Sequence, residues 1–127
     1  MKQIKKEMLK IYKPISNLDW MNYKLVKKDI TFHHIRKRCD GGNEIITNGA
    51  LLMPVAHQYL HLIECKDMET YIAINKIFEF VNQQQYEPTI EQRQIIEYLL
   101  KQFEKEHKWD KTSKGKLLIQ QKYLCRF

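Results

Sequence analysis

The sequence has few of the residues that mark disulfide-stabilised or turn-rich folds. Its 127 residues include only three cysteines, four glycines and three prolines. Cys39, Cys65 and Cys125 are widely spaced and form no CxxC pair, which argues against a zinc knuckle and against a disulfide framework. Scarce glycine and proline argue against a collagen-like chain or an all-β sandwich. The cysteine pattern favours a reduced, cytoplasmic setting.

Long apolar runs are also missing. No uninterrupted run approaches the roughly 20 residues that span a bilayer, and no apolar segment follows the basic N-terminus as in an export signal. We therefore expect a protein that neither spans a membrane nor is exported. Apolar residues nevertheless make up 43% of the chain, enough to build the core of one domain.

The net charge of +7 is distributed unevenly along the chain. Residues 1–38 hold eleven basic and three acidic residues, residues 39–104 hold four basic and ten acidic ones, and residues 105–127 hold seven basic and two acidic ones. Two basic ends around an acidic middle suggest a polyanion partner. Solvated lysines without a partner would give the same pattern, so charge alone leaves both interpretations open.

Residue patterns predict one short β segment in the N-terminal half of the chain. Apolar spacing predicts a helix over 2–12 that ends before Pro14. β-Branched and aromatic residues predict a strand over 30–35 and a second, irregular strand over 45–52. Pro54 suits the first position of a helix that continues to residue 64.

Two longer helices are predicted after this segment. The first covers 66–84, with Asp67 as its N-cap and Met68 and Ile72 among its buried side chains. The second begins at Thr89, where the residues fit a capping box, and ends near His107. Both helices are acidic, so we expect them to pack on the β segment or on a partner rather than on nucleic acid.

Four of the five histidines lie between residues 33 and 61. His33 and His34 are adjacent on the first predicted strand, so their side chains should point to opposite faces. His57 and His61 are four residues apart on the predicted helix and should share one face. A lone histidine more often has a structural role, but this grouping indicates a metal or catalytic site.

The grouping resembles a known family. The matching segments are Phe32-His33-His34-Ile35, Gly41-Gly42, Asn48-Gly49-Ala50-Leu51-Leu52, and the pair His57 and His61. Their order and spacing, with 14 residues from His34 to Asn48 and 23 from His34 to His57, resemble the HNH endonucleases of the ββα-metal superfamily. His61 adds a likeness to colicin-type DNases. The sequence departs from many members in lacking CxxC pairs and in having His33 where Asp is frequent.

The resemblance implies an α+β fold, with a small ββα-metal finger of two short strands and a helix embedded in a mainly helical single domain. The expected organisation is a basic N-terminal segment with a short helix over 1–29 and the ββα-metal HNH core over 30–64. A helical extension follows over 65–107, and a basic C-terminal tail over 108–127.

The resemblance also implies roles for individual residues. His34 matches the general base that takes a proton from water, and Asn48 matches the residue that braces the loop and orients this base. His33, His57 and His61 match the ligands of one divalent metal ion. A histidine titrates near pH 6.5 and can therefore act as a base at neutral pH. Mg²⁺ or Mn²⁺ is the expected ion, with Zn²⁺ or Ni²⁺ as the alternatives that imidazole ligands favour.

Three cations follow the base directly. Arg36, Lys37 and Arg38 are expected to bind DNA phosphates, because guanidinium groups make paired contacts to phosphate oxygens. Glu64 and Asp40 could orient ligand histidines, but a surface role is the favoured interpretation for both.

Three functions are consistent with these features. The favoured one is a metal-dependent DNA endonuclease of the small kind found in phages and mobile elements. The second is a catalytically inactive nucleic-acid-binding module, and the third is a structural zinc module that uses His33, His57 and His61. An RNA substrate and a homodimer stay open.

Overall fold

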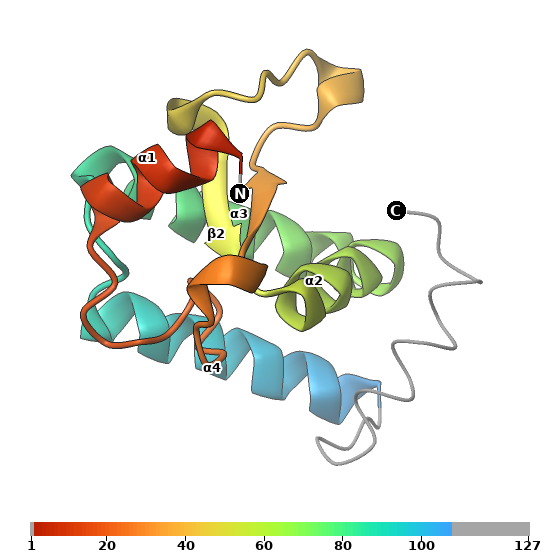
Figure 1. Cartoon of the computed structure of the whole chain (residues 1–127). Helices are drawn as coiled ribbons and strands as arrows, with labels where there is room; N and C mark the ends of the chain where they lie inside the picture. Colours follow the sequence, from red (N-terminus) through yellow and green to blue (C-terminus); the bar gives the residue numbers. More distant parts are fainter. Residues whose placement is uncertain (1, 108–127) are drawn as a thin grey trace.

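The computed structural model describes residues 2–107, so the predicted basic tail over 108–127 lies outside the described residues. In the described range, α-helices surround one antiparallel hairpin (Figure 1). The elements are α1 (Gln3–Tyr12), β1 (Thr31–His34), β2 (Gly49–Leu52), α2 (Pro54–Lys66), α3 (Met68–Gln84) and α4 (Ile90–Glu106). The predicted α+β class, with a short hairpin in a mainly helical domain, is confirmed. No helix within 2–107 has the length and apolar character to cross a lipid bilayer.

The hairpin positions the histidines of β1. β1 and β2 pair with Thr31 opposite Leu52 and His34 opposite Gly49. The second strand is shorter than the predicted range of 45–52, because residues 46–48 form a 3₁₀ turn before it. In this turn the Asn48 amide donates to the Ile45 carbonyl at 2.9 Å, so this segment does not extend the ladder.

The helix starts follow the local signals of the sequence. Pro54 occupies the first turn of α2, and Asp67 caps α3 by accepting a hydrogen bond from the Thr70 amide at 3.2 Å. Thr89 and Gln92 form the complete capping box that begins α4. Such caps each stabilise a helix by about 1 kcal/mol, because they satisfy amides that have no partner inside the helix.

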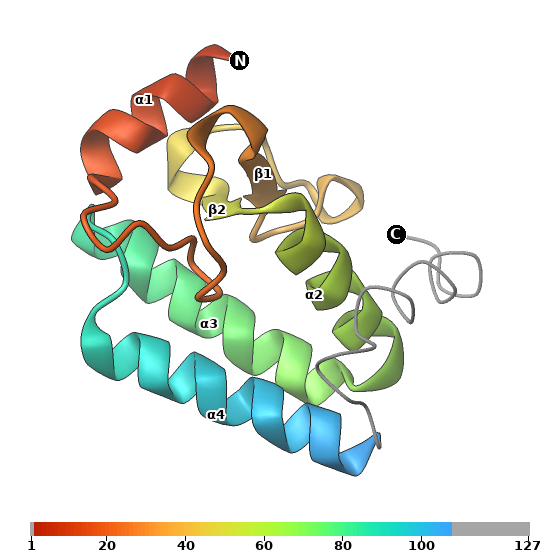
Figure 2. The same ribbon diagram turned by 60° about the horizontal axis from the view of Figure 1, so that its bottom comes forward.

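Helix α3 lies at the centre of the molecule, between α2 on one side and α4 on the other (Figure 2). Its buried face carries Tyr71, Ile74 and Phe78. Met68 and Ile72, predicted to be buried, are 51% and 49% exposed instead. They lie at the edge of the packed face and line an open groove, so the apolar stripe is narrower than the sequence indicates.

Two buried asparagines connect α3 to the hairpin. The side-chain amide of Asn82 donates to the carbonyls of Ile46 and Gly49 at 2.6 and 2.7 Å. The backbone carbonyl of Asn82 accepts from the Tyr12 hydroxyl at 3.1 Å. Asn75, two turns earlier on the same helix, contacts His33 of β1. The acidic helix α3 therefore packs on the β segment, which is one of the two arrangements expected for it.

Candidate metal centre

Three histidines converge between β1 and α2. One ring nitrogen each from His33, His57 and His61 lies within 4.8 Å of the other two. The ring centroids are 5.3 Å apart for His33 and His57, 5.7 Å for His33 and His61, and 4.9 Å for His57 and His61. Spacing of four residues places the two α2 rings on one face, and the hairpin brings that face against His33. We refer to these three residues as the histidine cluster.

His33 is held from α3. Its Nε2 lies 2.9 Å from Asn75 Oδ1, and because this oxygen can only accept, Nε2 carries the proton. The side chain is 1% exposed, and Nδ1 has no hydrogen-bond partner. Burial lowers the pKa of His33 to about 3, so the ring is neutral at pH 7. A buried nitrogen lone pair with no donor facing it fits a metal ion.

His57 is held from β1. Its Nδ1 lies 2.9 Å from the Thr31 hydroxyl, which itself donates to the Leu52 carbonyl at 2.6 Å. The hydroxyl proton is therefore used, and the hydroxyl oxygen accepts from His57 Nδ1–H. The lone pair of His57 consequently lies on Nε2. Burial lowers the pKa of His57 to about 4, which also keeps this ring neutral.

His61 is held from its own helix. Its Nδ1 lies 3.1 Å from Glu64 Oε1, so Nδ1 donates and the lone pair lies on Nε2. The other carboxylate oxygen of Glu64 forms an ion pair with Lys37, and the Glu64 side chain is only 10% exposed. The surface role predicted for Glu64 is therefore wrong, because a spacing of three residues on the helix turns its carboxylate toward His61.

All three histidines thus have one nitrogen fixed by an oxygen acceptor. Metal-binding histidines typically donate their second ring nitrogen in this way, which sets the tautomer and orients the ring. Three imidazoles suit Zn²⁺, Ni²⁺ or Co²⁺ well and Mg²⁺ less well. Thr31 and Asn75 were missed from the sequence. Thr31 lies two residues before His33 on the same strand face and gave a local signal, whereas Asn75 is 42 residues away.

His34 lies on the other face of β1, as strand alternation predicts. Its ring packs edge-on against Phe32 with centroids 5.0 Å apart, and it is half-buried. Burial and then the positive charge of Arg38 lower the pKa of His34. A charge on His34 would also lower the pKa of His33 and of His57, so the ring is within electrostatic range of the cluster.

Asn48 joins the two ends of the loop that separates the strands. Its Oδ1 accepts from the Arg36 amide at 2.8 Å, and its Nδ2 donates to the carbonyls of Arg36 and Asn43 at 2.9 Å each. Its own carbonyl accepts from the Ile35 amide, also at 2.9 Å. These contacts fix the backbone directly after His34.

The three cations after His34 have different surroundings. Arg36 and Arg38 are exposed, whereas Lys37 turns toward α2 and pairs with Glu64. Arg38 lies 3.9 Å from Glu44, which is 3.3 Å from Lys2 of the N-terminal segment. Both arginines are therefore exposed, and Arg38 has one surface ion pair, whereas the lysine between them pairs with a largely buried carboxylate.

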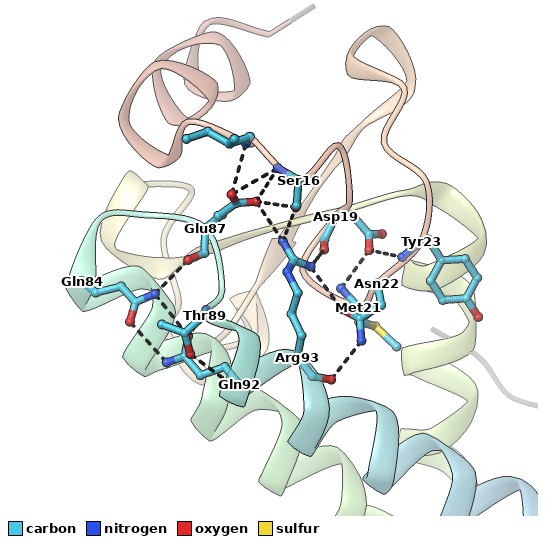
Figure 3. A network of polar contacts seen from close by, with 11 residues as sticks. Ser16, Asp19, Met21, Asn22, Tyr23, Gln84, Glu87, Thr89, Gln92 and Arg93 are labelled. Carbon is cyan, nitrogen blue, oxygen red and sulfur yellow. Dashed lines mark hydrogen bonds and ion pairs between the residues drawn. The ribbon is translucent and has the colours of Figure 1, made fainter.

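A buried carboxylate fixes the start of α2. Asp19 accepts hydrogen bonds from the amides of Met21, Tyr23 and Met53, each at 2.8 Å, and Met53 is the N-cap residue of α2. Burial raises the pKa of Asp19 to about 6. Arg93 of α4 donates to the Asp19 carbonyl at 2.6 Å and pairs with Glu87 at 3.1 Å (Figure 3). This network sets the position of the helix that carries two members of the histidine cluster.

A second group of potential ligands is explained by helix capping. Asp67, Glu106 and His107 also bring ligand atoms within 4.8 Å of one another. Both carboxylate oxygens of Asp67, however, accept from Thr70, at 3.2 Å from its amide and 2.7 Å from its hydroxyl. Asp67 therefore acts as the N-cap of α3.

Among residues 2–107, the histidine cluster is the group of potential ligands with a buried, unpartnered nitrogen. It could bind a metal ion, with further coordination positions left for water or a ligand. Comparisons with models of known protein families, with curated proteins and with solved structures find no match to this chain.

Proposed function

We propose that this protein is a metal-dependent endonuclease of HNH type that hydrolyses DNA phosphodiester bonds. The observation that carries the proposal is the convergence of His33, His57 and His61, with His34 next to them on the opposite face of β1. A metal site beside a histidine that can accept a proton is the combination that phosphodiester hydrolysis by activated water requires.

In this proposal the histidine cluster holds one divalent ion, Mg²⁺ or Mn²⁺ in the working enzyme and Zn²⁺ or Ni²⁺ as tighter-binding alternatives. When bound, the ion would stabilise the negative charge that develops on the scissile phosphate. The hydrogen bond to Asn75 leaves the lone pair of His33 on Nδ1. The hydrogen bonds to Thr31 and Glu64 leave the lone pairs of His57 and His61, respectively, on Nε2.

His34 is the general base. Burial and Arg38 lower its pKa, which favours the neutral ring that a general base requires. Asn48 maintains the backbone around the base through Ile35 and Arg36. The exposed Arg36 and Arg38 would bind phosphates of the strand on either side of the site.

The cluster favours a catalytic ion over a structural one. Structural zinc sites have four protein ligands, whereas catalytic sites have three and a position for water. The described residues supply three histidines to this cluster and no fourth Cys, His, Asp or Glu. This count supports an enzyme in preference to a structural zinc module.

Nicking of supercoiled plasmid DNA tests the proposal. The wild-type chain is expected to nick with Mn²⁺ or Mg²⁺ and to stop in EDTA. His34→Ala should lower the nicking rate at least about 100-fold, the lower range for loss of a general base, while Zn²⁺ binding stays unchanged. His57→Ala should lose both nicking activity and Zn²⁺ binding. His107→Ala, which removes a histidine at the C-terminal end of α4 that packs on Phe103 and is not part of the histidine cluster, is the matched control.

Two results would contradict the proposal. Nicking by His34→Ala at the wild-type rate would show that His34 is not the general base. A wild-type protein that binds Zn²⁺ and DNA but cleaves neither DNA nor RNA with any divalent ion would indicate the inactive binding module.

A further inference from the structure

The loop after His34 carries three consecutive cations, and the middle one differs from its neighbours in its surroundings. Arg36 and Arg38 are exposed. The Lys37 side chain is 39% exposed and its ammonium group pairs with Glu64 near the end of α2. Three neighbours of like charge therefore do not share one environment, and a common role in phosphate binding does not follow from their sequence.

The loop backbone holds Lys37 in this orientation. The Lys37 carbonyl accepts from the amides of Asp40 and Gly42 at 3.0 and 2.8 Å. A Cβ atom at Gly42 would lie 1.8 Å from the Arg36 carbonyl oxygen, so only glycine permits this closure. Lys37 thus extends toward α2 from a tightly folded turn.

Glu64 connects Lys37 to the histidine cluster. One carboxylate oxygen accepts from His61 Nδ1 at 3.1 Å, and the other pairs with Lys37. A carboxylate that is 10% exposed is costly to bury without a counter-charge. Lys37 supplies that charge and limits the carboxylate to one orientation, in which it fixes the tautomer and ring plane of His61.

We infer that Lys37 is a positioning residue of the metal centre, which acts through Glu64 on His61, and that Arg36 and Arg38 alone contact phosphate. This inference rests on the metal centre of the proposed function but not on cleavage. The basic loop then has two roles. The exposed guanidinium groups of Arg36 and Arg38 bind the polyanion, and the Lys37 ammonium group orients the ligands of the metal centre.

Two adjacent substitutions that remove the same charge separate these roles. Lys37→Met and Arg38→Met are prepared in the full chain and checked for folding by thermal unfolding in EDTA. Zn²⁺ affinity is measured by competition with a chromophoric chelator, and the visible spectrum is recorded with Co²⁺. DNA binding is measured in EDTA at several salt concentrations.

Lys37→Met is expected to weaken Zn²⁺ binding about tenfold, the lower range for loss of an outer partner of a ligand, and to shift the Co²⁺ spectrum. Its salt dependence of DNA binding should equal that of the wild type. Arg38→Met should leave Zn²⁺ affinity and the Co²⁺ spectrum unchanged but reduce the slope of log K against log salt by about one. Lys37→Arg, which keeps the charge, should restore most of the Zn²⁺ affinity.

A double-mutant cycle tests the route through Glu64. Glu64→Gln retains an oxygen acceptor for His61 but not the charge that attracts Lys37. In that background Lys37→Met should cause no further loss of Zn²⁺ affinity. Additive losses, or a Lys37→Met protein with wild-type Zn²⁺ affinity and a reduced salt slope, would overturn the inference. Absence of nicking by a protein that behaves as expected here would instead refute the proposed function.

Discussion

The contact between Asn75 and His33 gives the sharpest test of the histidine cluster. Asn75→Leu keeps the size of the side chain but removes the acceptor of His33 Nε2–H, a bond of 2.9 Å between two buried groups. Without it nothing favours the tautomer that leaves Nδ1 available. We therefore expect Asn75→Leu to weaken Zn²⁺ binding by about 10- to 100-fold, which corresponds to about 1.4 to 2.7 kcal/mol.

The same substitution should lower the free energy of unfolding in EDTA by about 1 to 3 kcal/mol, because a buried N–H loses its partner. Asn75→Asp separates the two effects. The carboxylate accepts more strongly and should raise Zn²⁺ affinity above that of the wild type, while its buried charge should destabilise the metal-free protein. Chelator competition measures the affinity, and urea unfolding in EDTA measures the stability.

Asn82→Leu is the matched control for this test. Asn82 is also a buried α3 amide, but its bonds go to Ile46 and Gly49 rather than to the histidine cluster. It should destabilise the metal-free protein to a similar extent and leave the Zn²⁺ affinity of the folded protein close to the wild type. Equal Zn²⁺ affinities for Asn75→Leu and Asn82→Leu would refute the reasoning.

Three further outcomes follow from the geometry. In EDTA the unfolding free energy should fall by a few kcal/mol from pH 7 to pH 4, because the folded-state pKa values of His33 and His57 lie below the unfolded value and their contribution is lost as the pH falls. The raised pKa of Asp19 acts in the opposite direction, but the effect of this one group is smaller than that of the two histidines together. Urea unfolding at a series of pH values would measure the net decrease. Asp19→Asn should destabilise the protein by about 1 to 3 kcal/mol at pH 7, since an amide N–H₂ would face the Met53 amide; a calorimetric melting temperature unchanged from the wild type would contradict this. Thr89→Ala should lose about 1 kcal/mol, measurable in the same melts, because the capping box is removed.

The elements of this fold were predictable where their signals are local. The capping box at Thr89, the N-cap at Asp67 and the position of Pro54 depend on contacts within four residues, and all three occur as the sequence indicates. Strand alternation likewise separated His33 from His34. The spacing of His57 and His61 was sufficient to place both rings on one helix face.

The features that the sequence did not reveal depend on tertiary contacts. Asn75 has no local signal in the sequence, because only the packing of α3 against β1 brings its amide to His33. The sequence favours a surface role for Glu64 because nothing in it places Lys37 opposite this carboxylate. Periodicity places Met68 and Ile72 in the core, because it does not indicate where a groove opens on the surface.

The dependence of His33 on α3 has a consequence for the order in which this protein matures. During synthesis His33, His57 and His61 emerge before Asn75 does, so a nascent chain already has the three histidines but not the amide that orients His33. A fragment cut after α2 would, for the same reason, be a poor substitute for the intact chain in any metal-binding assay.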